Sequence, residues 1–270
     1  MFFLNRISVT IFLCIGCYFN VLSQKGYIND GGIYVEVNKN HTHKDYNWDN
    51  HIYTKGRKFY FNFIYSKNDT NKFFDLGYNS QWFFSDTIST RTVRNIKITI
   101  LEGLEPFLKF DSAYNQTVMK IDYVTSSKFQ TFEQTGIIEN RKNVWLHPPR
   151  ISLFTILELN PFPFIRAPYK IGNKWKWQLD IGGIWGDKRW CEWKEIIKNE
   201  YQYEIVEKKD VKTPIGVLSC FIVDAKATSP LGNTYLRSYF NHKYGFVKYE
   251  FTNIDKSKLL FELTQVEEEK

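Results

Sequence analysis

The stretch that decides the fold lies in the last third of the chain, where a turn precedes an apolar run: Thr213-Pro214-Ile215-Gly216, then Val217-Leu218-Ser219-Cys220-Phe221-Ile222-Val223. Proline presets the backbone for a turn, and glycine reaches conformations closed to other residues. The run is rich in β-branched and aromatic residues and is short enough for a strand. Similar segments at 233–240 and 246–251 are joined by a short loop containing Gly245. Residues 201–266 therefore predict four or five consecutive β-strands.

Strand patterns also fill the first half of the chain. Residues 95–100 and 119–123 alternate strictly between apolar and polar side chains, so each is predicted to bury one face. The clearest helix candidate is 151–159, which follows two prolines and must end before Asn160-Pro161. The predicted fold class is all-β: a curved antiparallel sheet or an open barrel-like meander with at most one short helix.

The N-terminus has the pattern of a signal peptide. Arg6 precedes the apolar run 7–19, which is too short to span a bilayer, and Ser23 offers a cleavage site before Gln24. We expect residues 1–23 to be removed and the protein to be periplasmic or extracellular. The alternative is a lipoprotein signal, with Gly16 before a lipid-anchored Cys17. No later stretch is apolar enough for a transmembrane span, so none is expected after cleavage.

Residues 24–270 are predicted to form one β-rich domain, with 24–145 and 146–270 as the alternative division into halves. The net charge of +7 is dispersed, because acids accompany the basic pairs at 141–142 and 208–209, which argues against a nucleic-acid partner. The 23 Phe, 17 Tyr and 8 Trp can bury enough apolar area for a core without disulfides. Cys191 and Cys220 fit a bridge and two buried free thiols equally well.

The candidate ligand-binding residues are mostly tryptophans, clustered within nineteen residues: Trp175, Trp177, Trp185, Trp190 and Trp193. Trp175 and Trp177 would share one face of a strand. Flat aromatic rings beside acids are typical of a sugar-binding cleft, and two carboxylates there could serve a glycoside hydrolase as acid and base. The acids concerned are Asp180, Asp187, Glu192 and Glu195. The same pattern also fits a hydrophobic core with a solvated rim, which is the favoured interpretation.

Two further candidates flank the rigid pair Pro148-Pro149, which cannot lie within a sheet. This segment would present His147 and Arg150 at an opening, or it would form a structural crossover between two parts of the sheet. The histidines at 41 and 43, with His51, suggest a metal site, but no regular spacing completes a ligand set. No metal and no cofactor are therefore predicted.

The C-terminal third resembles a group of exported bacterial proteins. The residues that carry the resemblance are Thr213-Pro214-x-Gly216, Cys220 and Tyr244-Gly245-Phe246-Val247-Lys248, and they are similar to those of the TapB-like group and a related domain of unknown function. The resemblance covers about residues 170–265 and implies an envelope β-sheet protein without an established enzymatic site.

The predicted function is that of a non-enzymatic exported cell-envelope protein, which binds an apolar or glycan ligand or a protein partner on an aromatic-rich β-sheet. The alternative is a secreted carbohydrate-active hydrolase that uses carboxylates near 175–193. No nucleophile elbow, phosphate loop or zinc-protease motif occurs in the sequence after residue 23, and whether the protein catalyses a reaction stays open.

Overall fold

The computed structural model describes residues 26–30, 32–37, 50–77, 81–101, 116–126 and 131–268. The strands of the N-terminal half are β1 (Gly26–Asp30), β2 (Ile33–Val37), β3 (Lys58–Lys67), β4 (Thr70–Leu76), β5 (Trp82–Ser85), β6 (Asn95–Ile100), β7 (Thr117–Val124), β8 (Thr131–Glu139) and β9 (Asn143–Leu146). The remaining strands are β10 (Phe164–Arg166), β11 (Lys174–Ile181), β12 (Ile197–Thr213), β13 (Gly216–Ser229), β14 (Gly232–Asn241), β15 (Gly245–Thr252) and β16 (Lys258–Glu267). Two short 3-10 helices are η4 (Ser152–Leu159) and η5 (Gly183–Trp185).

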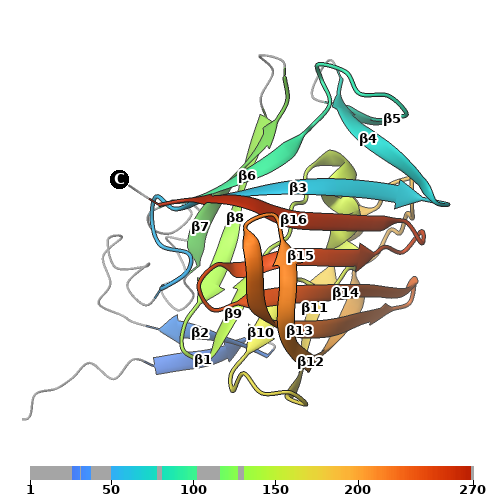
Figure 1. Cartoon of the computed structure of the whole chain (residues 1–270). Helices are drawn as coiled ribbons and strands as arrows, with labels where there is room; N and C mark the ends of the chain where they lie inside the picture. The colour runs from blue at the N-terminus through green and yellow to red at the C-terminus, as the bar shows by residue number, and fades with distance from the viewer. Residues whose placement is uncertain are drawn as a thin grey trace, which may run out of the picture.

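Most of the strands form one antiparallel sheet that curls into a nearly closed barrel (Figure 1). The order is β10-β9-β8-β7-β6-β3-β16-β15-β14-β13-β12-β11, so β10 and β11 are its two ends. β4 and β5 branch off β3 as a separate ribbon. The prediction of an all-β, antiparallel, barrel-like fold is confirmed, including the short helix predicted at 151–159.

Aromatic side chains fill the seam between the two end strands. The Trp177 ring of β11 lies 5.7 Å from the Trp145 ring of β9 and 5.3 Å from that of Phe162. The Trp175 ring lies 5.5 Å from the Phe164 ring of β10. Because β10 and β11 are not paired by hydrogen bonds, this aromatic layer closes the barrel.

The β1–β2 hairpin crosses this seam. The backbone N–H of Tyr34 donates to Asn143 Oδ1 of β9 at 2.7 Å, and the Arg166 guanidinium of β10 donates to the Tyr34 hydroxyl at 2.6 Å. The hairpin turn touches β11 so closely that a Cβ at Gly32 would collide with the carbonyl oxygen of Lys176. The hairpin therefore contacts strands on both sides of the seam.

The barrel interior is filled by side chains around η4. Phe154 of η4 is fully buried, and its ring lies within 6 Å of the rings of Phe63, Phe74, Trp82, Tyr123 and Phe261. The diproline carries the chain from β9 into this helix. A small apolar cavity of about 20 Å³ beside Pro149 has room for about one water molecule.

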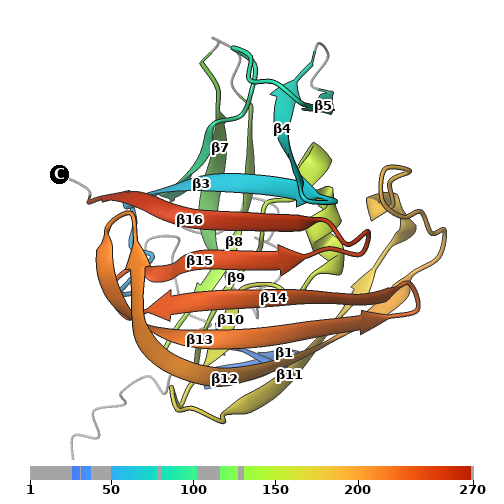
Figure 2. The same ribbon diagram turned by 45° about the vertical axis from the view of Figure 1, so that its right-hand side comes forward.

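The turn predicted at 213–216 joins the two longest strands. Thr213 pairs with Gly216 across a two-residue loop, and Gly216 has φ +122°. A register shift between Ile205 and Glu207 accompanies a bend in the hairpin. The distal half of β12–β13 consequently leaves the pairing with β14 and bends back toward β16, as Figures 1 and 2 show, and its half-buried Val211, Ile215 and Leu218 pack against the core.

Candidate functional site

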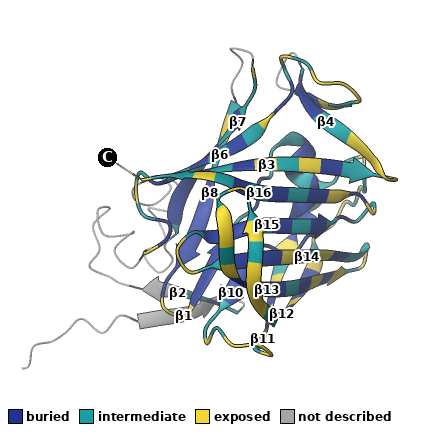
Figure 3. Ribbon diagram, in the orientation of Figure 1, coloured by how far each residue is buried: buried dark blue, intermediate teal, exposed yellow. Residues whose placement is uncertain are grey.

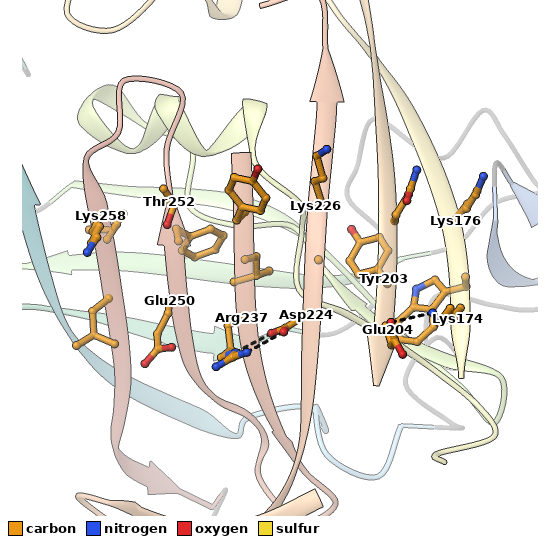
Figure 4. A pocket seen from close by; sticks show the side chains of 18 of the residues that line it. Lys174, Lys176, Tyr203, Glu204, Asp224, Lys226, Arg237, Glu250, Thr252 and Lys258 are labelled. Atoms are coloured by element: carbon orange, nitrogen blue, oxygen red, sulfur yellow. Dashed lines mark hydrogen bonds and ion pairs between the residues drawn. The ribbon is translucent and has the colours of Figure 1, made fainter. Parts of the chain in front are cut away.

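A groove of about 950 Å³ lies on the outer face of the barrel. Each of β11–β16 contributes three consecutive residues to it, and β3 contributes two, so the groove runs across the strands (Figure 4). Its lining is Ile64, Ser66, 174–176, 202–204, 224–226, 235–237, 250–252 and 258–260.

The two-residue period of the strands separates this face from the core. Trp175, Tyr203 and Ala225 are buried, whereas their neighbours along each strand point outward. Figure 3 shows this alternation of buried and exposed positions along β13 to β16. The outward side chains of the groove are therefore held in place by the buried residues that alternate with them along each strand.

The first row of outward side chains carries charges that neutralise one another. Lys174 Nζ lies 3.1 Å from a Glu204 carboxylate oxygen. Arg237 donates two hydrogen bonds of 2.7 Å to the two carboxylate oxygens of Asp224, and this pairing raises the pKa of Arg237. Glu250, opposite Arg237, accepts from Lys248 at 3.0 Å.

The second row is different, because its cations are not compensated in this way. Cross-strand register places the following residues side by side: Lys176, Gln202, Lys226, Tyr235, Thr252, Lys258 and Ser66. The three lysines are exposed, and within the part of the chain that the structure describes none of them lies in an ion pair. Tyr235, in the middle of the row, is 44% exposed.

A second polar cluster contains His147 and Arg150 together with Glu133 and Glu158. The His147 Nδ1–H donates to the Pro148 carbonyl at 2.8 Å, which leaves Nε2 as an acceptor 3.6 Å from Glu158 Oε1. The Arg150 backbone N–H donates to Glu133 at 3.0 Å, and its guanidinium lies 5.7 Å from the centre of the Trp185 ring.

Burial keeps both groups of the His147–Glu158 pair neutral between about pH 3 and about pH 7. It lowers the pKa of His147 from 6.5 to about 3, with the charge of Arg150 acting in the same direction. It raises the pKa of Glu158 from 4.5 to about 7. The side chains of His147 and Glu158 are only 12% and 4% exposed. The structure thus brings His147 and Arg150 together, but it encloses His147 in the core.

The five tryptophans fall into two groups. Trp175 and Trp177 are buried in the seam, with the Tyr203 and Tyr201 rings stacked on them at 5.4 and 4.7 Å. The other three, Trp185, Trp190 and Trp193, are partly exposed on the loop 182–196. The cluster does not form one continuous aromatic surface, although Trp175 is among the residues that line the groove.

The acids considered for a hydrolase have separate surroundings. Asp187 is paired with Arg189, which lowers the pKa of Asp187. Asp180 lies opposite Lys198 across β11 and β12, while Glu192 and Glu195 are exposed. Cys191 and Cys220 are both free thiols, and burial raises the pKa of Cys220 to about 11.

Sequence reasoning missed the second row of the groove, called the lysine row after Lys176, Lys226 and Lys258. The alternation around Lys176 and Lys226 indicates that both side chains face outward, but only cross-strand register brings them into line with Lys258. Among the described residues, no three His, Cys, Asp or Glu side chains are placed to hold a metal ion. His51 is exposed, whereas His41 and His43 lie outside the described residues.

The fold and the groove define a nearly closed antiparallel barrel with a filled interior and a recessed outer face. A protein described as exported, with a YmcC-like fold, from Bacteroides fragilis aligns at 11% identity and a TM-score of 0.44, over 80% of this chain and 97% of that one. A protein described as a lipoprotein from Parabacteroides distasonis aligns at 11% identity and a TM-score of 0.43, over 80% and 97% of the two chains. The hypothetical lipoprotein YmcC from Escherichia coli aligns at 8% identity and a TM-score of 0.34, over 81% and 91%.

No protein-family model matches the sequence, and neither does any curated protein sequence. The resemblance of the C-terminal third to the TapB-like group is not confirmed by the structural likenesses and stays a prediction. In the described part of the chain, no helix is long and apolar enough to cross a membrane.

Proposed function

We propose that the protein is an exported, non-enzymatic binding protein of the cell envelope, and that its ligand lies in the groove on the outer face of β11–β16 and β3. The observation that carries the proposal is the groove itself. Its volume of about 950 Å³ falls at the upper end of the range for small-molecule sites, roughly 300–1,000 Å³. The interior cavity of about 20 Å³ beside Pro149, by contrast, is far below that range.

The construction of the groove favours an extended ligand held by side chains. Strands β12 to β16 are each paired on both sides, so their backbone groups are already used in the ladders. A ligand across these strands must therefore be recognised by the outward side chains. Their anchorage in a packed sheet keeps them in place before the ligand arrives, which lowers the entropic cost of binding.

The binding proposal is tested by filling the groove. Gln202 is exposed on the groove face of β12, and Gln178 is exposed on β11 outside the groove lining. We expect Gln202→Trp to reduce binding of a ligand found on arrays of neutral and acidic glycans, peptides and lipids, and the matched variant Gln178→Trp to bind it normally. Equal binding by both variants, or no binding by the wild type, would overturn the proposal.

The export part of the proposal rests on Arg6 and the apolar run 7–19, which lie outside the described residues. Intact-mass measurement of protein recovered from the envelope is expected to show a chain that starts at Gln24. An acylated start at Cys17 would replace this outcome with a lipid-anchored protein. A chain that still carries Met1 would contradict export by either route.

A further inference from the structure

We infer that the groove binds an acidic polysaccharide, which lies across the strands along the row that contains Lys176, Lys226 and Lys258. This inference rests on the proposed binding function and names the class of ligand. The structural observation behind it is the contrast in charge between two neighbouring rows of the same groove.

The lysine row carries positive charge that the acids of the groove lining do not neutralise. The acids that line the groove are already engaged, because Glu204 pairs with Lys174 and Asp224 pairs with Arg237. Glu250 likewise pairs with Lys248, which lies outside the groove lining. The positive charges of Lys176, Lys226 and Lys258 are therefore left to act on a ligand. A groove lined by unpaired charge of one sign attracts ligands of the opposite sign.

The lysine row is long, because its three lysines lie on strands that are far apart in the sheet. Lys176 lies on β11, Lys226 two strands away on β13, and Lys258 three strands further on β16. With about 4.8 Å between neighbouring strands, the lysines are separated by about 10 and 14 Å, and the row extends over about 24 Å. A single phosphate or carboxylate cannot contact all three lysines. A polymer with an anionic group at intervals along its length can do so.

The uncharged side chains of the lysine row favour a sugar over a peptide. Tyr235, exposed between Lys226 and Thr252, offers a flat ring on which a pyranose can stack. Gln202, Thr252 and Ser66 supply neutral donors and acceptors that suit hydroxyl groups. A peptide that crosses the strands would have to leave its own backbone groups without a β-ladder partner, since it cannot add to the sheet in this direction. These features favour an acidic glycan over an acidic peptide.

The experiment uses three probes of known composition: oligogalacturonates that carry a carboxylate on each sugar, neutral dextran oligosaccharides, and poly-glutamate of similar charge. Isothermal titration calorimetry on residues 24–270 is expected to show binding of the oligogalacturonates that weakens as salt is raised. Neutral dextran should bind at least about tenfold more weakly, since it forms no ion pair with the lysines.

The matched variants carry equal changes in charge. The groove variant is Lys176→Gln/Lys226→Gln/Lys258→Gln, and the control is Lys188→Gln/Lys194→Gln/Lys212→Gln, which changes exposed lysines outside the groove lining. Three exposed ion pairs together predict a loss of about tenfold in affinity for the groove variant. The affinity of the control variant should stay within about twofold of that of the wild type, because this variant has the same net charge as the groove variant but keeps the three groove lysines.

Tyr235 gives a second, independent readout. Tyr235→Ala should weaken oligogalacturonate binding about fivefold by removing the stacking ring, while Tyr235→Phe should retain most of the affinity. Thermal melts of each variant confirm that the fold is retained, as expected for changes at exposed positions.

The outcomes separate this inference from the proposed function. If poly-glutamate binds as tightly as the oligogalacturonates and responds to the same lysines, the glycan class is wrong and an acidic peptide takes its place. If neutral dextran binds in the groove and the lysine variant binds it normally, the inference of an anionic ligand fails while the binding function stands. If no probe or array ligand is sensitive to Gln202→Trp, both fail.

Discussion

The buried His147–Glu158 pair is the residue-scale feature with the clearest consequence for stability. Glu158 binds its proton more tightly in the folded protein, with a pKa of about 7 against 4.5, so its stabilisation is present below pH 4.5 and lost as pH rises through 7. His147 has a folded pKa of about 3 against 6.5, so its stabilisation is present above pH 6.5 and lost as pH falls toward 3. The two effects oppose each other between pH 4.5 and 6.5.

Removing the titration of Glu158 should change the shape of the stability curve. We expect the wild type to lose about 3 kcal/mol relative to Glu158→Gln as the pH rises from 4 to 8, because the amide stays neutral throughout. Urea unfolding of both proteins across this range measures the difference. If the free energy of unfolding depended on pH in the same way for both proteins, the pKa of Glu158 would be the same in the folded and unfolded states, and burial would not raise it.

Gly216 provides a test of backbone strain alone. It has φ +122°, and no atom lies within 4 Å of the position that a Cβ would occupy. Gly216→Val should therefore destabilise the protein by about 1–3 kcal/mol through backbone strain, without a steric clash.

Gly182 is a suitable control for that variant. It also has open space around its Cβ position, but its φ is −72°, which any residue adopts. Thermal melts should show a clear loss for Gly216→Val and little change for Gly182→Val. If Gly216→Val melts like the wild type while it loses ligand binding, the turn belongs to a binding site rather than to the framework.

At the scale of elements, the seam determines whether the sheet closes. Trp177 is 7% exposed and is surrounded by the rings of Trp145, Phe162 and Tyr201. Truncating such a side chain leaves a cavity where β11 meets the opposite end of the sheet. We expect Trp177→Ala to lower the free energy of unfolding by about 3–5 kcal/mol.

The partly exposed Trp185 is the comparison for this variant. It lies on η5, outside the seam, in contact with the Arg150 guanidinium. Trp185→Ala should cost less than about 1.5 kcal/mol, because less of its area is buried. Chemical denaturation of both variants gives the two values. Equal losses would show that the loop 182–196 supports the barrel as strongly as the seam does.

The elements also show what local sequence can predict. The turn at 213–216 and the alternation at 95–100 depend on neighbours in the chain, and the structure has both as expected, in the β12–β13 hairpin and in β6. The same period correctly places Trp175 and Trp177 on one face of β11. Which face meets the core is a different question, because it depends on strands far away in the sequence.

The groove illustrates that limit most clearly. Lys176, Lys226 and Lys258 come from three strands, and their alignment follows from the register of five pairings between β11 and β16. A shift of one residue in any of these pairings would turn one lysine toward the core. The candidate tryptophans, by comparison, stand out in the sequence because they are large and clustered, although two of them close the seam.

At the scale of the whole molecule, strand pairing joins the first half of the chain to the second. β3 of the first half pairs with β16 of the second from Lys58 to Ser66, and β9 pairs with β10 across the boundary at 145/146. The proposed groove also takes Ile64 and Ser66 from the first half. These connections support the proposal that 24–270 is one domain, because neither half has a complete sheet.

The division at 145/146 can be tested directly with the separate halves. Residues 146–270 alone would expose the edge of β16 that normally pairs with β3, and would leave the aromatic seam without Trp145. We expect this fragment and the fragment 24–145 each to lack a cooperative thermal transition and to aggregate, since long unpaired edges promote association.

Co-expression of the two fragments should recover a soluble complex, because the pairings of β3 with β16 and of β9 with β10 can form between separate chains. Circular dichroism and size-exclusion chromatography of the three samples distinguish the cases. A sharp melt of 146–270 on its own would mean that β10–β16 form an independent domain, and that the first half is attached to a framework already complete.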